Sequence, residues 1–146
     1  MKKNIQNIRK AVCTMANELR KKGLTLSQAF RKAWKRVKEG MIMRVAGTTF
    51  ENRQQRLAFL SQFRPDRLQA VLERETGNQH DGSAIRVIIR IPEIRRRTVI
   101  GYIPAAISGD IARLIDKGMD VRADMLGVIG GYSYKENYGL LLKVAI

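Results

Sequence analysis

Residues 72–103 read LERETGNQHDGSAIRVIIRIPEIRRRTVIGYI, and this stretch decides the fold. It contains the β-branched run Val87-Ile88-Ile89, which would lose side-chain freedom in a helix and therefore predicts a strand over residues 84–91. Turn-forming residues fill positions 77–83 just before that strand. The stretch is therefore expected to form a strand, a loop and two further strands.

The loop at 77–83 carries the only histidine of the chain, His80, beside Asp81. Strands on both sides should hold these two side chains still. We therefore expect the chemistry of the protein at this loop.

Short strands continue outward from this stretch in both directions. Six are expected, over residues 42–47, 67–75, 84–91, 98–103, 120–129 and 138–146. Residues 52–62 should add one or two helical turns, and a late helix should start at Pro104 and end at Gly118. This pattern predicts an α+β fold, a small antiparallel β-barrel of the SH3 or OB type with one helix packed on it.

Residues 1–40 predict a basic α-helical hairpin that precedes the 41–146 domain. Apolar residues recur every three or four positions over residues 3–22, and Thr25 with Gln28 matches a capping box at the start of a second helix. A short αα-hairpin buries little surface alone. It could dock on the main domain, bind a partner protein, self-associate or fray, and the sequence leaves these alternatives open.

Charge is the strongest feature of the composition. The 146 residues hold 28 lysines and arginines against 13 acidic residues, a net charge of +15. Residues 1–40 hold 12 of the basic residues against Glu18 and Glu39 only. Such a surplus favours a polyanionic partner, most often nucleic acid, although a basic domain without one remains an alternative. A helix-turn-helix that reads bases is disfavoured because no third supporting helix precedes Met41.

Several classes of protein are disfavoured by what the sequence lacks. No apolar run approaches the roughly 20 residues of a membrane span, and no apolar signal core follows the basic start, so a cytoplasmic protein is expected. The single cysteine, Cys13, cannot form an internal disulfide and is expected to fill the core. One histidine and one cysteine are too few for a zinc site, and neither a metal nor a cofactor is expected.

Residues 44–146 resemble a HIRAN domain, a small β-barrel module of fork-remodelling helicase-like proteins that also occurs alone in bacteria and phages. No single piece of the resemblance is specific, whereas the order and spacing of the pieces are. The matching pieces are Val45-Ala46-Gly47-Thr48-Thr49-Phe50 with Asn52-Arg53-Gln54, Leu72-Glu73-Arg74-Glu75, Asn78-Gln79-His80-Asp81-Gly82-Ser83-Ala84-Ile85, Ile100-Gly101-Tyr102-Ile103-Pro104, Asp116-Lys117-Gly118 and Tyr138-Gly139-Leu140.

The resemblance implies binding to single-stranded DNA, in particular its free 3′ end, in DNA repair, replication or a phage context. By it, Asp81 would accept a hydrogen bond from the 3′ hydroxyl, His80 stands where the family usually has tyrosine, and Phe50 would stack on an end nucleotide. Tyr102 lies at another contact position. Thr49 replaces a frequent basic residue, so the phosphates would fall to other residues, the candidates being Arg44, Arg53, Arg95, Arg96 and Arg97.

Each of these residues also has a structural interpretation. Asp81 before Gly82 could bind its own turn, Phe50 could belong to the core, and Arg95-Arg96-Arg97 could be a charged hairpin tip. A non-enzymatic module is the leading hypothesis. The alternatives are a small magnesium-dependent nuclease built on Glu73, Glu75 and Asp81, and an adaptor that binds a partner protein through residues 1–40.

Overall fold

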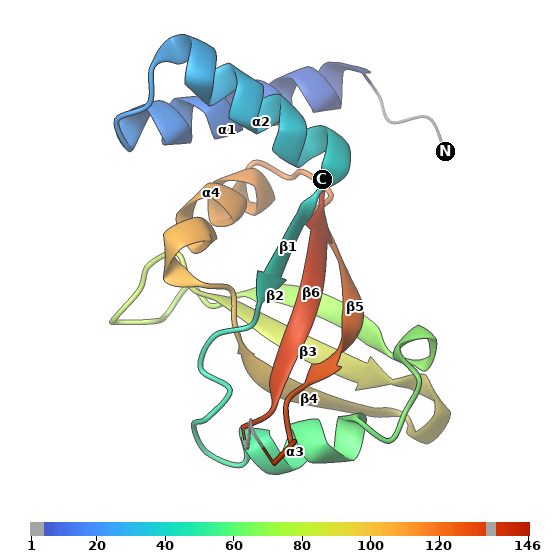
Figure 1. Ribbon diagram of the computed structural model, residues 1–146. Coiled ribbons are helices and arrows are strands. Elements are labelled where there is room, and N and C mark those ends of the chain that lie inside the picture. The colour runs from blue at the N-terminus through green and yellow to red at the C-terminus, as the bar shows by residue number, and fades with distance from the viewer. Residues whose placement is uncertain (1–4, 134–136) are drawn as a thin grey trace.

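The computed structural model describes residues 5–133 and 137–146. The predicted beginning of the first helix at residue 3 lies outside these residues. The described part has four α-helices, six strands and two short 3₁₀ turns, the mixed α+β composition expected from the sequence (Figure 1). Their bounds are α1 Ile5–Lys21, α2 Leu26–Glu39, β1 Met41–Arg44, α3 Arg53–Leu60, η1 Pro65–Arg67, β2 Gln69–Arg74, β3 Ile85–Ile91, η2 Pro92–Ile94, β4 Arg96–Tyr102, α4 Ala105–Asp116, β5 Arg122–Ile129 and β6 Gly139–Ala145.

Two predictions need correction. The strand expected over residues 42–47 ends at Arg44. The one or two helical turns expected within residues 52–62 are present as α3, an α-helix of eight residues, which adds to the one helix expected on the sheet. The main domain therefore has two helices. In the sequence, α3 precedes the β2–β3–β4 strands and α4 follows them. The capping box of α2 is confirmed, because the Gln28 N–H donates to Thr25 Oγ1 and the Thr25 N–H donates to Gln28 Oε1.

The six strands form one antiparallel sheet in the order β1-β6-β5-β2-β3-β4. This sheet is open, so the predicted closed barrel is wrong. The edge strands β1 and β4 meet only through an isolated bridge, in which Ala46 and Tyr102 exchange two N–H···O bonds of 2.8 and 2.9 Å. Gly47 follows with φ of 71°, so the chain turns away before a second pair can form.

The bridge depends on the absence of a side chain at Gly101. A Cβ at that position would lie 2.2 Å from the Ala46 carbonyl oxygen and 2.7 Å from Val45 Cγ1. Both contacts are shorter than real Cβ atoms tolerate. Gly101 therefore allows the β1 end to approach β4.

The core lies on one face of β3 and includes buried side chains of both the helical hairpin and the main domain. Ile85, Val87, Ile89 and Ile91 of β3 are buried, as their alternation requires. They share one apolar cluster with side chains of all four helices and of β6. Cys13 is exposed, contrary to the prediction, because it lies on the outer side of α1 next to the buried Val12.

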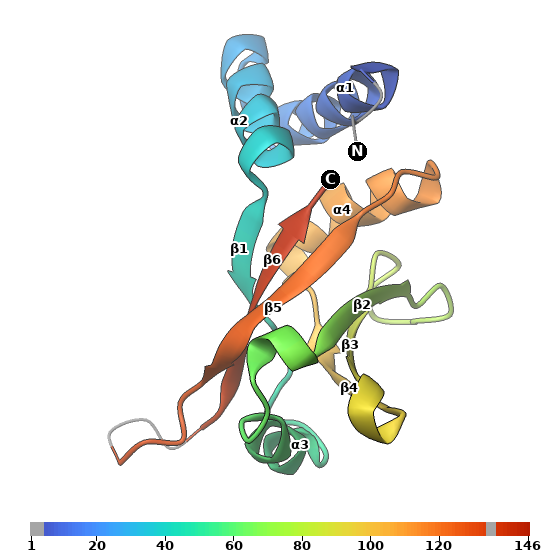
Figure 2. The same cartoon turned by 90° about the vertical axis from the view of Figure 1, so that its right-hand side faces the viewer.

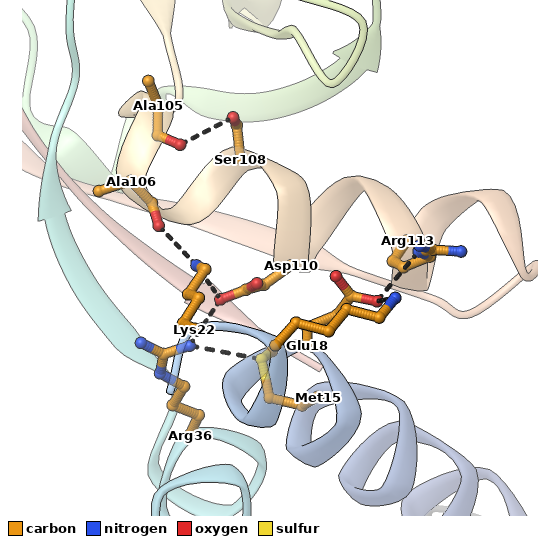
Figure 3. A network of polar contacts seen from close by, with 10 residues as sticks. Met15, Glu18, Lys22, Arg36, Ala105, Ala106, Ser108, Asp110 and Arg113 are labelled. Carbon is orange, nitrogen blue, oxygen red and sulfur yellow. Dashed lines mark hydrogen bonds and ion pairs between the residues drawn. The ribbon is translucent and has the colours of Figure 1, made fainter. Parts of the chain in front are cut away.

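The helical hairpin docks on α4, as Figures 1 and 2 show from two sides. Asp110 of α4 is 1% exposed, and its Oδ2 lies 3.1 Å from Lys22 Nζ and 3.0 Å from Arg36 Nη1 (Figure 3). The Lys22 ammonium also donates to the Ala106 carbonyl, and Arg113 Nε lies 3.2 Å from Glu18 Oε1. A buried carboxylate is tolerated when cations pair with it, so Asp110 requires both hairpin helices beside α4.

A search of the helices within residues 5–133 and 137–146 finds none that has both the length and the apolar character needed to cross a membrane.

Candidate nucleic-acid interface

The loop between β2 and β3, residues 75–84, is held in place by Asn78 and Arg74. Asn78 Oδ1 accepts the backbone N–H groups of His80 at 2.8 Å and Asp81 at 3.0 Å, a common way for asparagine to fix a turn. Arg74 donates to the carbonyls of Gly82 and Ala84. The loop has no regular secondary structure, and these hydrogen bonds fix its conformation.

Asp81 is half-buried and faces α4. Its Oδ1 accepts the backbone N–H of Ser83 at 2.9 Å, so the local-turn interpretation holds for that oxygen. Its Oδ2 lies 3.5 Å from the Ser108 hydroxyl, at the limit of a hydrogen bond. A carboxylate oxygen can accept more than one hydrogen bond, so Oδ2 has acceptor capacity to spare. The neighbouring His80 side chain is exposed.

A second set of contacts connects this loop to β4. Asn78 Nδ2 donates to Glu75 Oε2 at 2.9 Å. Hydrogen bonds from Asn78 and then from the Tyr102 hydroxyl hold the pKa of the Glu75 carboxyl below its ordinary value, although desolvation opposes them. Burial first, and then the bond to Glu75, raises the pKa of Tyr102. Tyr102 thus stays protonated and donates to Glu75.

Arg53 of α3 completes this set from the other side of the Tyr102 ring. Its guanidinium carbon lies 5.4 Å from the ring centre, and its Nη1 donates to the Gly47 carbonyl at 2.8 Å. The residue is only 7% exposed. Arg53 therefore serves first to hold β4, α3 and the Gly47 turn together.

Phe50 lies on the same turn and is 66% exposed. Carbons of the Phe50 and Tyr102 rings would both lie 3.8 Å from a Cβ placed on Gly47, so the two rings border the same glycine. An exposed ring on a positioned turn is suited to stack on a base. The structural alternative that Phe50 belongs to the core is wrong, because its side chain is exposed.

The predicted site residues lie in three places. Phe50, Arg53, Tyr102, His80 and Asp81 lie at one end of β4, connected through Glu75 and Asn78. The arginine run lies at the other end of β4, with Arg95 in a left-handed conformation (φ 51°) in the β3–β4 connection. In Figure 1 the 75–84 loop is on the left and this connection on the right. Arg44 is elsewhere again, on β1, with its guanidinium across Gly139 of β6.

The contacts of Glu73 and Glu75 count against the magnesium hypothesis. Glu73 binds Arg86 and Arg97, and Arg86 Nη1 also lies 4.0 Å from Glu75 Oε1. Arginines thus form ion pairs with the carboxylates that would have to bind the magnesium ion. Within the described residues, no three His, Cys, Asp or Glu side chains gather closely enough to bind a metal ion.

Sequence reasoning assigned no role to Gly47, Asn78 or Ser108. Asn78 could have been found, because asparagine shortly before a turn commonly binds the following backbone N–H groups. Gly47, at the end of a strand, is a weaker signal of the same kind. Ser108 gives none, because it is 27 positions from Asp81 and reaches the loop only through the docking of α4.

Comparison with known proteins gives one match. The family model described as HIRAN domain matches residues 25–128, well over half of the chain. The match begins at Thr25, the cap of α2, so it includes the second hairpin helix as well as most of the sheet. Neither the search of curated proteins nor the search of solved structures found a match.

HIRAN domains are generally non-catalytic modules that bind nucleic acid, single-stranded DNA in particular. The loop with Asp81, the exposed Phe50 and the arginines at positions 95–97 all lie within the matched residues. The chain belongs to the HIRAN domain family.

Proposed function

We propose that this chain is a non-enzymatic module that binds single-stranded DNA and holds its free 3′ end at the 75–84 loop. The observation that carries the proposal is the position of Asp81, whose Oδ2 has spare acceptor capacity. Handling of free strand ends in DNA repair, replication or mobile-element transfer is the context that such an activity would serve.

The chemistry of Asp81 selects a hydroxyl. An ionised carboxylate only accepts hydrogen bonds, so a 3′ hydroxyl can donate to Oδ2, whereas a 3′ phosphate would bring a second negative charge to the same place. The backbone bond from the Ser83 N–H keeps the carboxylate oriented before the strand arrives. An internal nucleotide has no 3′ hydroxyl to offer, and the loop would therefore distinguish an end from the middle of a strand.

The terminal base would stack on Phe50. Base–aromatic stacking contributes about 1–3 kcal/mol per base without requiring a particular sequence. The exposed His80 on the loop offers a smaller second surface. The net charge of +15 would supply the long-range attraction, and binding should weaken steeply with salt.

Strands that differ only at the 3′ terminus test the proposal. We expect the protein to bind a 5′-labelled strand with a 3′ hydroxyl at least about tenfold more tightly than the same strand with a 3′ phosphate, the size of one hydrogen bond to a charged group. Asp81→Ala should remove this preference. Asp66→Ala, at an exposed acid in η1, is the matched control and should keep it.

Equal affinity of the wild-type protein for the two strands would overturn recognition of the end. Absence of salt-dependent binding to any single strand would overturn the proposed function as a whole.

Exposed apolar residues on α2 favour a second candidate function, an adaptor that acts through the hairpin. Leu26 is 54% exposed and Trp34 is 49% exposed. Light scattering over a range of concentrations tests self-association through this face. A measured mass above that of one chain, which returns to that of one chain in Leu26→Ser/Trp34→Ser, supports self-association. The mass of a single chain at every concentration excludes self-association.

A further inference from the structure

A groove lies between α3 and the edge strand β4, at the end of β4 away from Asp81. It has a volume of about 370 Å³. Side chains of both elements line it, among them Gln55, Arg56 and Phe59 of α3 and Arg96, Arg97 and Thr98 of β4. Phe59 is 42% exposed, so the groove offers an accessible ring beside arginines.

More arginines surround this groove than the fold needs for its own contacts. Arg90 of β3 stands directly opposite Arg97 of β4, and like charges in that position destabilise a sheet. Arg95, in the β3–β4 connection, and Arg96, the first residue of β4, precede Arg97, and both are exposed. Among the described residues the nearby acids are already engaged, since Glu73 binds Arg86 and Arg97 and Glu93 binds Arg67. A bound anion would offset the remaining repulsion.

Arginines of α3 connect the groove with the predicted site residue Tyr102. Arg53 and Arg56 are one turn apart on α3, so the helix presents them on one face. Arg53 packs over Tyr102 at one end of β4, and Arg56 donates to the Val99 carbonyl further along it. From Tyr102 back to Arg97 the strand spans roughly 17 Å, which corresponds to about five stacked nucleotides of one DNA strand.

We propose that this groove binds backbone phosphates of the same single strand, about four to six nucleotides on the 5′ side of its 3′ end, with Arg96 and Arg97 as the phosphate ligands and Phe59 as a stacking surface. The inference rests on the proposed function and adds a direction to it. The strand enters past the β3–β4 connection, follows the α3–β4 groove and ends at Asp81.

Arg96→Gln/Arg97→Gln tests the groove. The matched control is Arg64→Gln/Arg122→Gln, which removes the same charge from exposed positions, each paired with a nearby aspartate. Binding is measured for single strands of about three and about twelve nucleotides with a 3′ hydroxyl. At about 0.1 M salt the groove variant should lose about 25-fold in affinity for the long strand, and its salt slope should fall by about 1.4.

The short DNA strand distinguishes the contribution of the groove from that of the 75–84 loop. It reaches only the Asp81 end, so the groove variant and the wild-type protein should bind it equally, and both should keep the preference for a 3′ hydroxyl. The control variant should match the wild-type protein on both strands. Replacing single phosphates of the long strand by uncharged methylphosphonates should weaken wild-type binding at about the fourth to sixth position from the 3′ end, and this position effect should vanish in the groove variant.

The outcomes of the two proposals are distinct. Unchanged long-strand affinity and salt slope in the groove variant, or an equal loss on the short strand, overturns the groove even if the 3′-hydroxyl preference is found. Conversely, a long-strand loss without any hydroxyl preference overturns end recognition and leaves the groove as a phosphate site. If the wild-type protein binds no strand, both proposals fail.

Discussion

The guanidinium of Arg53 lies 5.4 Å from the centre of the Tyr102 ring, and this contact joins α3 to the edge strand β4. The same guanidinium donates to the Gly47 carbonyl, and Tyr102 donates to Glu75. One arginine therefore connects the turn that presents Phe50 with the residues that support the Asp81 loop.

We expect Arg53→Lys to destabilise the protein by about 1–2 kcal/mol. Lysine keeps the charge, but it has neither the planar group that stacks on Tyr102 nor the fork that reaches Gly47. Arg53 Nε is buried without a partner in the described structure, and its loss offsets part of the cost. Urea unfolding measures the effect. Arg64→Lys, at a 78% exposed side chain, should change stability little, and an equally small change at Arg53 would contradict the role assigned to it.

Gly101→Ala should separate β1 from β4. The added methyl would overlap the Ala46 carbonyl oxygen, and the two hydrogen bonds of the Ala46–Tyr102 bridge would break. A loss of about 2–3 kcal/mol is expected in thermal or urea unfolding, from overpacking together with lost bonds. Gly127→Ala is the control, because no described atom outside its own neighbours lies within 4 Å of the new Cβ. Equal stabilities of the two variants would show that the bridge is dispensable.

Asp110→Asn should loosen the helical hairpin. The amide keeps the shape but leaves Lys22 and Arg36 without their counter-charge, and Arg36 is largely buried. A loss of about 2 kcal/mol is expected, below the usual range for buried pairs because Lys22 is half-exposed. Trypsin should then cleave the α1–α2 connection faster than in the wild-type protein. Asp120→Asn, whose side chain is 72% exposed, should do neither, and unaltered cleavage in Asp110→Asn would count against this attachment.

Stability should fall in acid partly through Glu75. Hydrogen bonds, from Asn78 first and Tyr102 next, hold the pKa of its carboxyl below the ordinary 4.5, so the folded protein binds fewer protons there than the unfolded chain. This contribution is complete above about pH 4.5 and disappears as the pH falls through the lowered pKa of the folded state. In Glu75→Gln the fall in stability between about pH 5 and about pH 3 should be smaller than in the wild-type protein. Asn78→Ala should flatten the profile in the same direction.

Urea unfolding at several pH values measures these profiles. Parallel curves for the wild-type protein and Glu75→Gln would show that the carboxyl contributes nothing to the pH dependence.

Local signals in the sequence were enough to predict most elements and the loop at the centre of the candidate site. The apolar stripe of α1, the capping box at Thr25 and the β-branched run of β3 are short-range patterns with a direct physical cause, and all three are confirmed. Where the pattern was local but ambiguous, the prediction was less accurate. Cys13 is one position from the buried Val12, and one position on a helix was enough to place it in solvent.

The sequence by itself determined the α+β composition, the cationic character and the turn chemistry around His80 and Asp81, because propensity, charge and turn formation act over a few neighbouring residues. Only the tertiary structure decided that the sheet stays open, that Asp110 holds the hairpin on α4, and that Arg53 covers Tyr102. These relationships join residues as far apart as 88 positions, and they depend on packing geometry that no local pattern encodes.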